Sequence, residues 1–153
     1  MNRYRWIGLV WAAAILILAA GAARADETVN IGGSRAVLIK PSAPRASVIL
    51  IPGGDGAISP GENGEINGLK FNQLVRTRHA YAARGLAVLV VDAGTPLNAA
   101  IQYMAAIKRP VTVIGTSRGT IRAAQGIAQG ARPDALVLTS GFLSAESGSG
   151  QNV

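Results

Sequence analysis

The feature that most constrains the fold is an apolar, β-branched run that ends in a Gly-x-Ser-x-Gly pattern. Val111-Thr112-Val113-Ile114 leads directly into Gly115-Thr116-Ser117-Arg118-Gly119, and the segment that follows is compatible with a helix. Because β-branched residues favour strands, this order predicts a strand, a tight turn at Ser117 and then a helix. The two glycines lack a Cβ atom, so the turn can tighten and the helix can pack closely on the strand.

A serine in such a turn is a candidate nucleophile. A hydroxyl is a poor nucleophile at neutral pH, so an enzyme must expose it, place a base beside it and supply donors to the developing oxyanion. The backbone N–H of Arg118 is expected at the N-terminus of the following helix, where such a donor is needed. The alternative is an ordinary glycine-rich turn, but the flanking strand and helix patterns favour the nucleophile turn.

Continuous apolar runs predict the central strands of a sheet. Such runs are typical of parallel strands that helices cover on both faces, so we expect all of them to be buried. Besides the run before Ser117, they occupy Ser47–Ile51, Leu86–Val91 and Ala135–Ser140. Two shorter runs, Val29–Ile31 and Ala36–Lys40, predict an N-terminal antiparallel hairpin.

Helical patterns lie between these strands. They cover Leu69–Arg84, Leu97–Lys108 and Thr120 to about Gln129. In the first of them, one face would carry Phe71, Leu74, Val75, Ala82 and Ala83. Strands that alternate with helices predict an α/β fold, a doubly wound and mostly parallel sheet behind an N-terminal antiparallel hairpin, in one domain over residues 26–153.

A second glycine-rich loop follows the strand at Ser47–Ile51. It begins with Pro52-Gly53-Gly54-Asp55-Gly56 and stays rich in glycine through Asn67. Glycines in this place let the backbone approach a ligand and turn its N–H groups inward. The loop lacks the Lys-Ser/Thr ending of a phosphate loop, and no zinc or calcium motif occurs, so we expect no cofactor and no metal.

The first 25 residues predict a signal peptide. Arg3 and Arg5 precede an apolar run from Trp6 to Ala23, and Ala23-Arg24-Ala25 is a small-x-small exit. Cleavage after Ala25 would make the protein exported, either periplasmic or secreted. An uncleaved anchor stays open, because the run approaches the roughly 20 residues of a spanning helix. Any membrane contact is then expected through this segment only.

Charge and cysteine content narrow the partners. The 153 residues carry a formal net charge of +7, but three of the 15 Lys and Arg (Arg3, Arg5 and Arg24) lie in the N-terminal segment, which leaves 12 against 8 Asp and Glu. The excess is scattered without a basic stripe, so we expect no nucleic-acid partner. Cysteine is absent, which excludes disulfides and cysteine nucleophiles.

The order of elements after residue 25 resembles the α/β-hydrolase superfamily. The shared features are the hairpin, a strand that ends in the glycine-rich loop Pro52–Gly56, a strand that ends in Asp92, and the turn Gly115–Gly119. The resemblance implies an exported serine hydrolase with Ser117 as nucleophile and a small-molecule ester or other acyl compound as substrate. It also implies an oxyanion hole made by the backbone N–H groups of Arg118 and of Gly54 or Asp55.

The chain departs from that family in its acid and base. The family's triad runs Ser, then Asp or Glu, then His, with the last two after later strands, and this chain lacks those strands. Its one histidine, His79, precedes Ser117 on a predicted helix, where a surface residue is expected rather than a base. Glu146, after the last strand, is either the acid or a solvated tail residue. A truncated or degenerate, non-catalytic protein that binds a small molecule or a partner therefore remains the alternative function.

Several other polar residues are candidates for the same site. Asp92 is expected to cap the turn after its strand by accepting from backbone N–H groups. Asp55 stays open between a loop cap and a substrate contact. Four further side chains are weighed as lining residues, of which Arg118 is placed to hold an anionic substrate group: Asn72, Arg76, Arg118 and Arg122.

Overall fold

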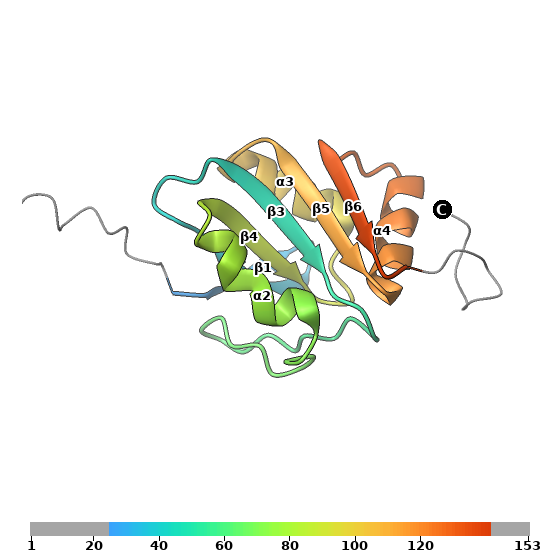
Figure 1. Cartoon of the computed structure of the whole chain (residues 1–153), viewed down its shortest axis with the longest axis horizontal. Coiled ribbons are helices and arrows are strands. Elements are labelled where there is room, and N and C mark those ends of the chain that lie inside the picture. The colour runs from blue at the N-terminus through green and yellow to red at the C-terminus, as the bar shows by residue number, and fades with distance from the viewer. Residues whose placement is uncertain (1–24, 142–153) are drawn as a thin grey trace, which may run out of the picture.

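A computed structural model describes residues 25–141, which build one sheet with helices on both faces (Figure 1). The strands are β1 (Glu27–Ile31), β2 (Ser34–Ile39), β3 (Ala46–Ile51), β4 (Leu86–Val91), β5 (Val111–Thr116) and β6 (Ala135–Thr139). The helices are α2 (Gln73–Ala82), α3 (Leu97–Ile107) and α4 (Arg118–Ala128). The predicted α/β fold is confirmed.

The sheet order places the two glycine-rich loops side by side. The six strands run in the order β1-β2-β4-β3-β5-β6; β1 pairs with β2 and β2 with β4 antiparallel, while β4, β3, β5 and β6 are parallel. In the register between β3 and β5, Ile51 lies opposite Gly115. Because parallel strands end at the same edge, Pro52 and Ser117 leave the sheet as neighbours.

Alternate residues of the central strands point to opposite faces, and each face has its own helices. On one face Ile49 and Leu89 pack with residues of α3 and α4, among them Met104 and Ala123. On the other face Val48, Leu50, Val88 and Val90 pack with Leu74 and Val75 of α2. Figure 1 shows α2 in front of the sheet and α3 behind it. The continuous apolar runs of β3 and β4 follow from this double cover.

Helix α2 is shorter than the pattern over Leu69–Arg84 predicts. Leu69 has a φ of +50°, and Asn72 has an extended backbone and accepts a hydrogen bond from the Leu74 N–H at 3.0 Å. This N-cap starts the helix at Gln73, so Phe71 lies outside it and is 97% exposed. Capping chemistry therefore decided the start of α2 against the apolar pattern.

Strand β6 is exposed, so the prediction of a buried strand at Ala135–Ser140 was wrong. Leu136, Val137 and Leu138 are 40%, 42% and 36% exposed. Among the described residues β6 pairs with β5 on one side only. The prediction assumed that helices cover both faces of every apolar strand. The interior strands have this cover, and the edge strand β6 lacks it.

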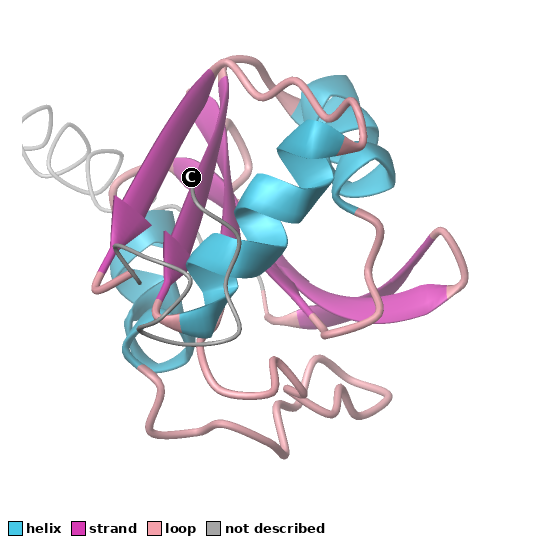
Figure 2. Ribbon diagram, turned by 90° about the vertical axis from the view of Figure 1, so that its right-hand side faces the viewer, coloured by secondary structure: helices cyan, strands magenta, loops and turns pink. Residues whose placement is uncertain are grey.

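A long loop between β3 and α2 runs past the carboxyl ends of the strands and lies at the bottom of Figure 2. Asp92, directly after β4, holds it there, because its Oδ1 accepts from the N–H groups of Ile58 (2.7 Å) and Ser59 (3.2 Å). Asp92 therefore accepts from backbone N–H groups, as the sequence predicts, but these groups belong to the loop before α2 and not to the turn after its own strand. Glu65 closes the outer part of the loop: hydrogen bonds from the Asn63 and Glu65 backbones lower the pKa of its carboxyl.

The predicted signal segment lies almost entirely in residues 1–24, outside the part of the chain that the structure describes. Within residues 25–141, none of the helices has the length and apolarity needed to cross a membrane.

Candidate active site

Ser117 is the one residue between the end of β5 and the start of α4, as the sequence predicts. Its backbone has φ 52° and ψ −128°, a conformation that residues other than glycine rarely adopt. Hydrogen bonds on both sides hold it. The Ser117 N–H donates to the Thr139 carbonyl of β6 at 3.0 Å, and the Ser117 carbonyl accepts from the N–H and the hydroxyl of Thr120 at 2.9 and 2.7 Å.

Gly115 and Gly119 are required by close backbone approaches. A Cβ atom on Gly115 would lie 2.8 Å from the Gly119 carbonyl oxygen. A Cβ atom on Gly119 would overlap the Ile51 carbonyl oxygen and lie 2.7 Å from that of Pro52. The first contact closes the turn on itself, and the second packs the start of α4 against the end of β3. Both physical reasons given for the glycines from the sequence are therefore confirmed.

The loop Pro52–Gly56 lies against the turn. A Cβ atom on Gly53 would be 2.9 Å from the Ser117 Cβ, 3.1 Å from the Thr116 carbonyl oxygen and 3.4 Å from Nδ2 of Asn72. Gly53 is thus the point where β3, β5 and the start of α2 meet. The expected position of Ser117, facing this loop, is confirmed, while its role as nucleophile stays a prediction.

The backbone N–H groups predicted as oxyanion donors have no hydrogen-bond acceptor in the described part of the chain. Among the hydrogen bonds within residues 25–141, none has the backbone N–H of Gly54, Asp55 or Arg118 as donor. Arg118 is the first residue of α4, so its N–H lies at the positive end of the helix dipole. The Asp55 carboxylate accepts from the Ala57 N–H at 3.0 Å, so it caps the loop, the first of the two roles left open from the sequence.

Asn72 presents an amide donor to the same place. Because its Oδ1 accepts from the Leu74 N–H, its Nδ2 is the atom that faces Gly53. The sequence marked Asn72 only as a lining residue. The signal that could have found its orientation is the N-cap preference of asparagine, which fixes the carbonyl end of the side chain on the helix.

Arg122 reaches from α4 to the carbonyl oxygens of the loop. Its Nη2 donates to the Pro52 oxygen and, at 3.5 Å, to that of Gly53, and its Nη1 donates to the Gly54 oxygen at 3.3 Å. Burial lowers the pKa of its guanidinium and Arg118 lowers it further, whereas Asp55 acts in the opposite direction. No sequence pattern predicts these contacts, because they join residues about 70 positions apart.

His79 does not lie at the site. Its Nε2 is 3.5 Å from Oδ2 of Asp26, and its side chain is 58% exposed. It follows Asn72 by two helical turns, so it lies about 10 Å along the helix axis from the end of α2 that faces Ser117. The surface position expected from the sequence is confirmed. Arg76 is exposed on the same helix, and Glu146 lies outside the described residues.

Among the described residues, no carboxylate or imidazole forms a hydrogen bond or ion pair with Ser117. Nor do they form a cluster of three or more His, Cys, Asp or Glu side chains that could hold a metal ion.

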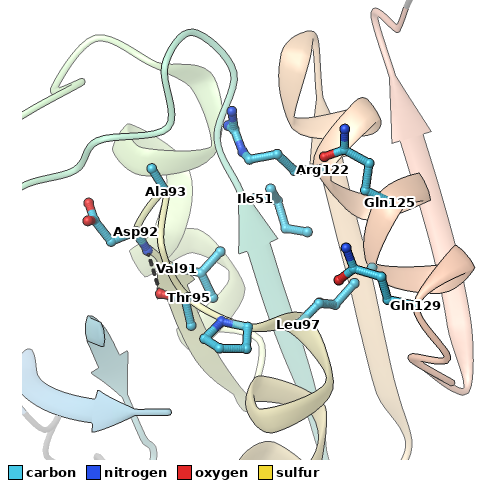
Figure 3. A pocket seen from close by; sticks show the side chains of 11 residues that line it. Ile51, Val91, Asp92, Ala93, Thr95, Leu97, Arg122, Gln125 and Gln129 are labelled. Carbon is cyan, nitrogen blue, oxygen red and sulfur yellow. Dashed lines mark hydrogen bonds between the residues drawn. The ribbon is translucent and has the colours of Figure 1, made fainter. Parts of the chain in front are cut away.

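Two hollows flank this arrangement. The first has a volume of about 160 Å³ and lies between the end of β4 and α4, with Asp92 and Thr95 on one side and Arg122, Gln125 and Gln129 on the other (Figure 3). Ser117 is not among its lining residues. The second has a volume of about 430 Å³ and is lined by Asn67, Leu69, Lys70, Phe71 and Asn72.

Comparison with known proteins gives matches among solved structures only. No family model matches the chain, and no curated protein matches its sequence. The crystal structure of TT1662 from Thermus thermophilus matches with a TM-score of 0.55 and 19% identity, over 77% of this chain and 57% of that chain. The crystal structure of EstE5 soaked with p-nitrophenyl butyrate matches with a TM-score of 0.54 and 14% identity, over 95% and 55%.

A further match is an esterase of the bacterial hormone-sensitive lipase family, with a TM-score of 0.51 and 22% identity over 79% of this chain and 45% of that chain. The chain thus spans about half the length of the solved structures it resembles. At these identities the likeness concerns the fold. Over the shared length, with its strand order and its serine turn between β5 and α4, the chain has the fold of the α/β-hydrolase superfamily.

Proposed function

We propose that this chain carries the nucleophile and the oxyanion hole of a serine hydrolase that acts on an ester or a related acyl compound. The observation that supports this most is the strained backbone of Ser117, held beside a glycine-rich loop in which the N–H groups of Gly54 and Asp55 have no acceptor within residues 25–141. A strained residue costs stability, so its position beside these donors favours a functional role.

In the proposed reaction, Oγ of Ser117 attacks the acyl carbonyl carbon. The carbonyl oxygen becomes an oxyanion, which accepts hydrogen bonds from the backbone N–H of Arg118 and of Gly54 or Asp55. Collapse of the tetrahedral intermediate breaks the bond to the leaving alcohol and leaves an acyl-serine, which water then hydrolyses. The Ser117 proton passes to water and water returns a proton to the departing alkoxide, because no base or acid among the described residues contacts the hydroxyl.

Slow turnover follows from that arrangement. Enzymes that lose a member of the triad keep roughly 10³ to 10⁴-fold catalysis over water, which comes from the oxyanion hole and binding. We therefore expect weak hydrolysis of p-nitrophenyl butyrate, the ester used with EstE5. Ser117→Ala should remove it, and His79→Ala should leave it unchanged, because His79 lies on the surface of α2.

Release of nitrophenol by the purified chain and by both variants tests this proposal, with mass spectrometry of acylated Ser117 as a second measurement. Equal rates for the chain and Ser117→Ala would reject it. A large loss in His79→Ala would instead make His79 the base.

The second candidate function is binding without catalysis. It is favoured by the absence, among the described residues, of any base in contact with Ser117. A boronic acid that forms a tetrahedral adduct with a serine hydroxyl separates the two functions: an adduct at Ser117 together with Ser117-dependent turnover favours the hydrolase, and neither of them favours the binding protein.

We also propose that the protein is exported after cleavage behind Ala25. The folded part makes use of the residues that directly follow this position: the Asp26 carboxylate accepts from Nε of Arg78 at 3.0 Å, and β1 begins at Glu27. N-terminal sequencing of the protein from its native host is expected to start at Asp26. A sequence that starts at Met1 or Asn2 would contradict the proposal.

A further inference from the structure

We propose that Arg122 is a positioning residue that orients the oxyanion donors by binding the opposite side of their peptide groups. This inference rests on the proposed function, in which Gly54 or Asp55 donates to the oxyanion. Arg122 belongs to α4, the helix that begins next to Ser117, so one element carries both the nucleophile turn and the group that holds the facing loop.

The contacts of Arg122 are all with main-chain oxygens of consecutive residues. The guanidinium donates to the carbonyls of Pro52, Gly53 and Gly54, the last two at 3.5 and 3.3 Å. Its planar set of five N–H donors can engage several acceptors at once, which an ammonium group does less well. Three consecutive carbonyls on one cation define the orientation of the loop backbone.

Peptide geometry converts these contacts into an orientation of the N–H groups. In a trans peptide the C=O of one residue and the N–H of the next point in opposite directions. When the Gly53 and Gly54 oxygens face Arg122, the N–H groups of Gly54 and Asp55 face away from it. These are the N–H groups that have no protein acceptor among the described residues. Arg122 thus binds one end of each peptide dipole and leaves the other end for a ligand.

The guanidinium occupies a place that only glycine leaves open. Gly56 has a φ of +82°, and a Cβ atom on it would lie 2.6 Å from Cζ of Arg122 and 2.7 Å from Nη2. Two charged side chains act on the group: Asp55 attracts it from the loop, and Arg118 repels it from the preceding turn of α4. A cation on the carbonyl side also polarises the peptide, which makes its N–H a stronger donor.

Kinetics of matched arginine variants test the proposal. Removal of one oxyanion donor typically lowers kcat by about 10² to 10³-fold, so a loop that is only misoriented should cost less. For Arg122→Met we expect a fall in kcat of about 10 to 100-fold with KM changed less than about twofold. Arg122→Lys should regain part of kcat. The control is Arg132→Met, because Arg132 also binds carbonyl oxygens, those of Ile127 (3.0 Å) and Ala131 (2.8 Å), at the far end of α4.

Backbone order measured by ¹⁵N relaxation gives a readout that does not depend on activity. In Arg122→Met, the order parameters of Gly54 and Asp55 should fall from about 0.85 to below about 0.6, while Arg132→Met leaves them unchanged. If Arg122→Met does not fold, the same measurement on Arg122→Lys replaces it.

The two readouts keep the two proposals apart. Unchanged kcat and unchanged loop order in Arg122→Met, with turnover that still needs Ser117, would overturn the role of Arg122 and leave the proposed function in place. If turnover does not need Ser117, the proposed function fails. Loop order then decides whether Arg122 holds the loop: lower order in Arg122→Met supports the holding role, and unchanged order overturns it.

Discussion

At the scale of single residues, the site depends on the strained backbone of Ser117 and on glycines that have no Cβ atom. Ser117 keeps a backbone conformation that suits glycine, and its neighbours in the turn are glycines because carbonyl oxygens occupy the space of a Cβ atom. Gly53 lets Ser117 and Asn72 approach from two sides. The side chain of Ser117 is therefore held at a cost in backbone energy, which is the pattern expected when a residue is kept for chemistry.

The strain at Ser117 leads to a prediction about stability. Ser117→Gly should unfold at higher urea concentration than Ser117→Ala, by about 1 kcal/mol in the free energy of unfolding, because glycine relieves the positive φ and alanine keeps it. Urea unfolding followed by circular dichroism measures the difference. Equal midpoints for the two variants would mean that the turn is not strained in solution.

At the scale of elements, α4 and α2 bring their N-terminal ends to the same edge of the sheet. Helix α4 starts beside Ser117, and α2 starts at the Asn72 cap, whose Nδ2 lies next to Gly53. Both starts are set by local chemistry, a glycine-flanked turn in one case and an N-cap in the other. What brings them together is the pairing of β3 with β5.

Substitutions at Asn72 can separate its two functions, which are the capping of α2 by Oδ1 and the presentation of Nδ2 to the site. Asn72→Ala should lower the free energy of unfolding by about 1 kcal/mol, whereas Asn72→Ser, which retains a capping oxygen, should lower it by only a few tenths. Differential scanning calorimetry of both variants measures this. If the two variants melt together, the hydrogen bond to Leu74 does not contribute to the stability of α2.

At the scale of the whole molecule, the two edges of the sheet differ. The edge strand β1 carries polar residues, among them Glu27, Thr28 and Asn30. The strand at the other edge of the described sheet, β6, exposes Leu136, Val137 and Leu138. An exposed apolar edge with unpaired backbone groups favours pairing with another chain.

We therefore predict self-association through β6. Val137→Lys should reduce it, because a lysine on an edge strand opposes strand pairing. Sedimentation velocity at increasing protein concentration measures the effect, and Asn30→Lys on β1 is the control with the same added charge. Equal sedimentation of the two variants would contradict a role of β6 in self-association.

Much of the fold and part of the site could be predicted from local signals. Apolar runs predicted β3, β4 and β5, and the Gly-x-Ser-x-Gly pattern predicted the turn at Ser117 with its two glycines. The surface position of His79 also followed from its neighbours in the chain. These features depend on periodicity, turn geometry and residue size, which act over a few positions.

The amino-acid sequence by itself determined the strand, turn and helix around Ser117, because each of these depends on residues a few positions apart. Only the tertiary structure decided which groups surround that turn. The register of β3 against β5 places Gly53 on Ser117, and the order of the strands leaves β6 exposed although its residues are as apolar as those of β3. Arg122 binds carbonyls about 70 positions away, a contact that exists only once the order of the strands has brought the two loops together.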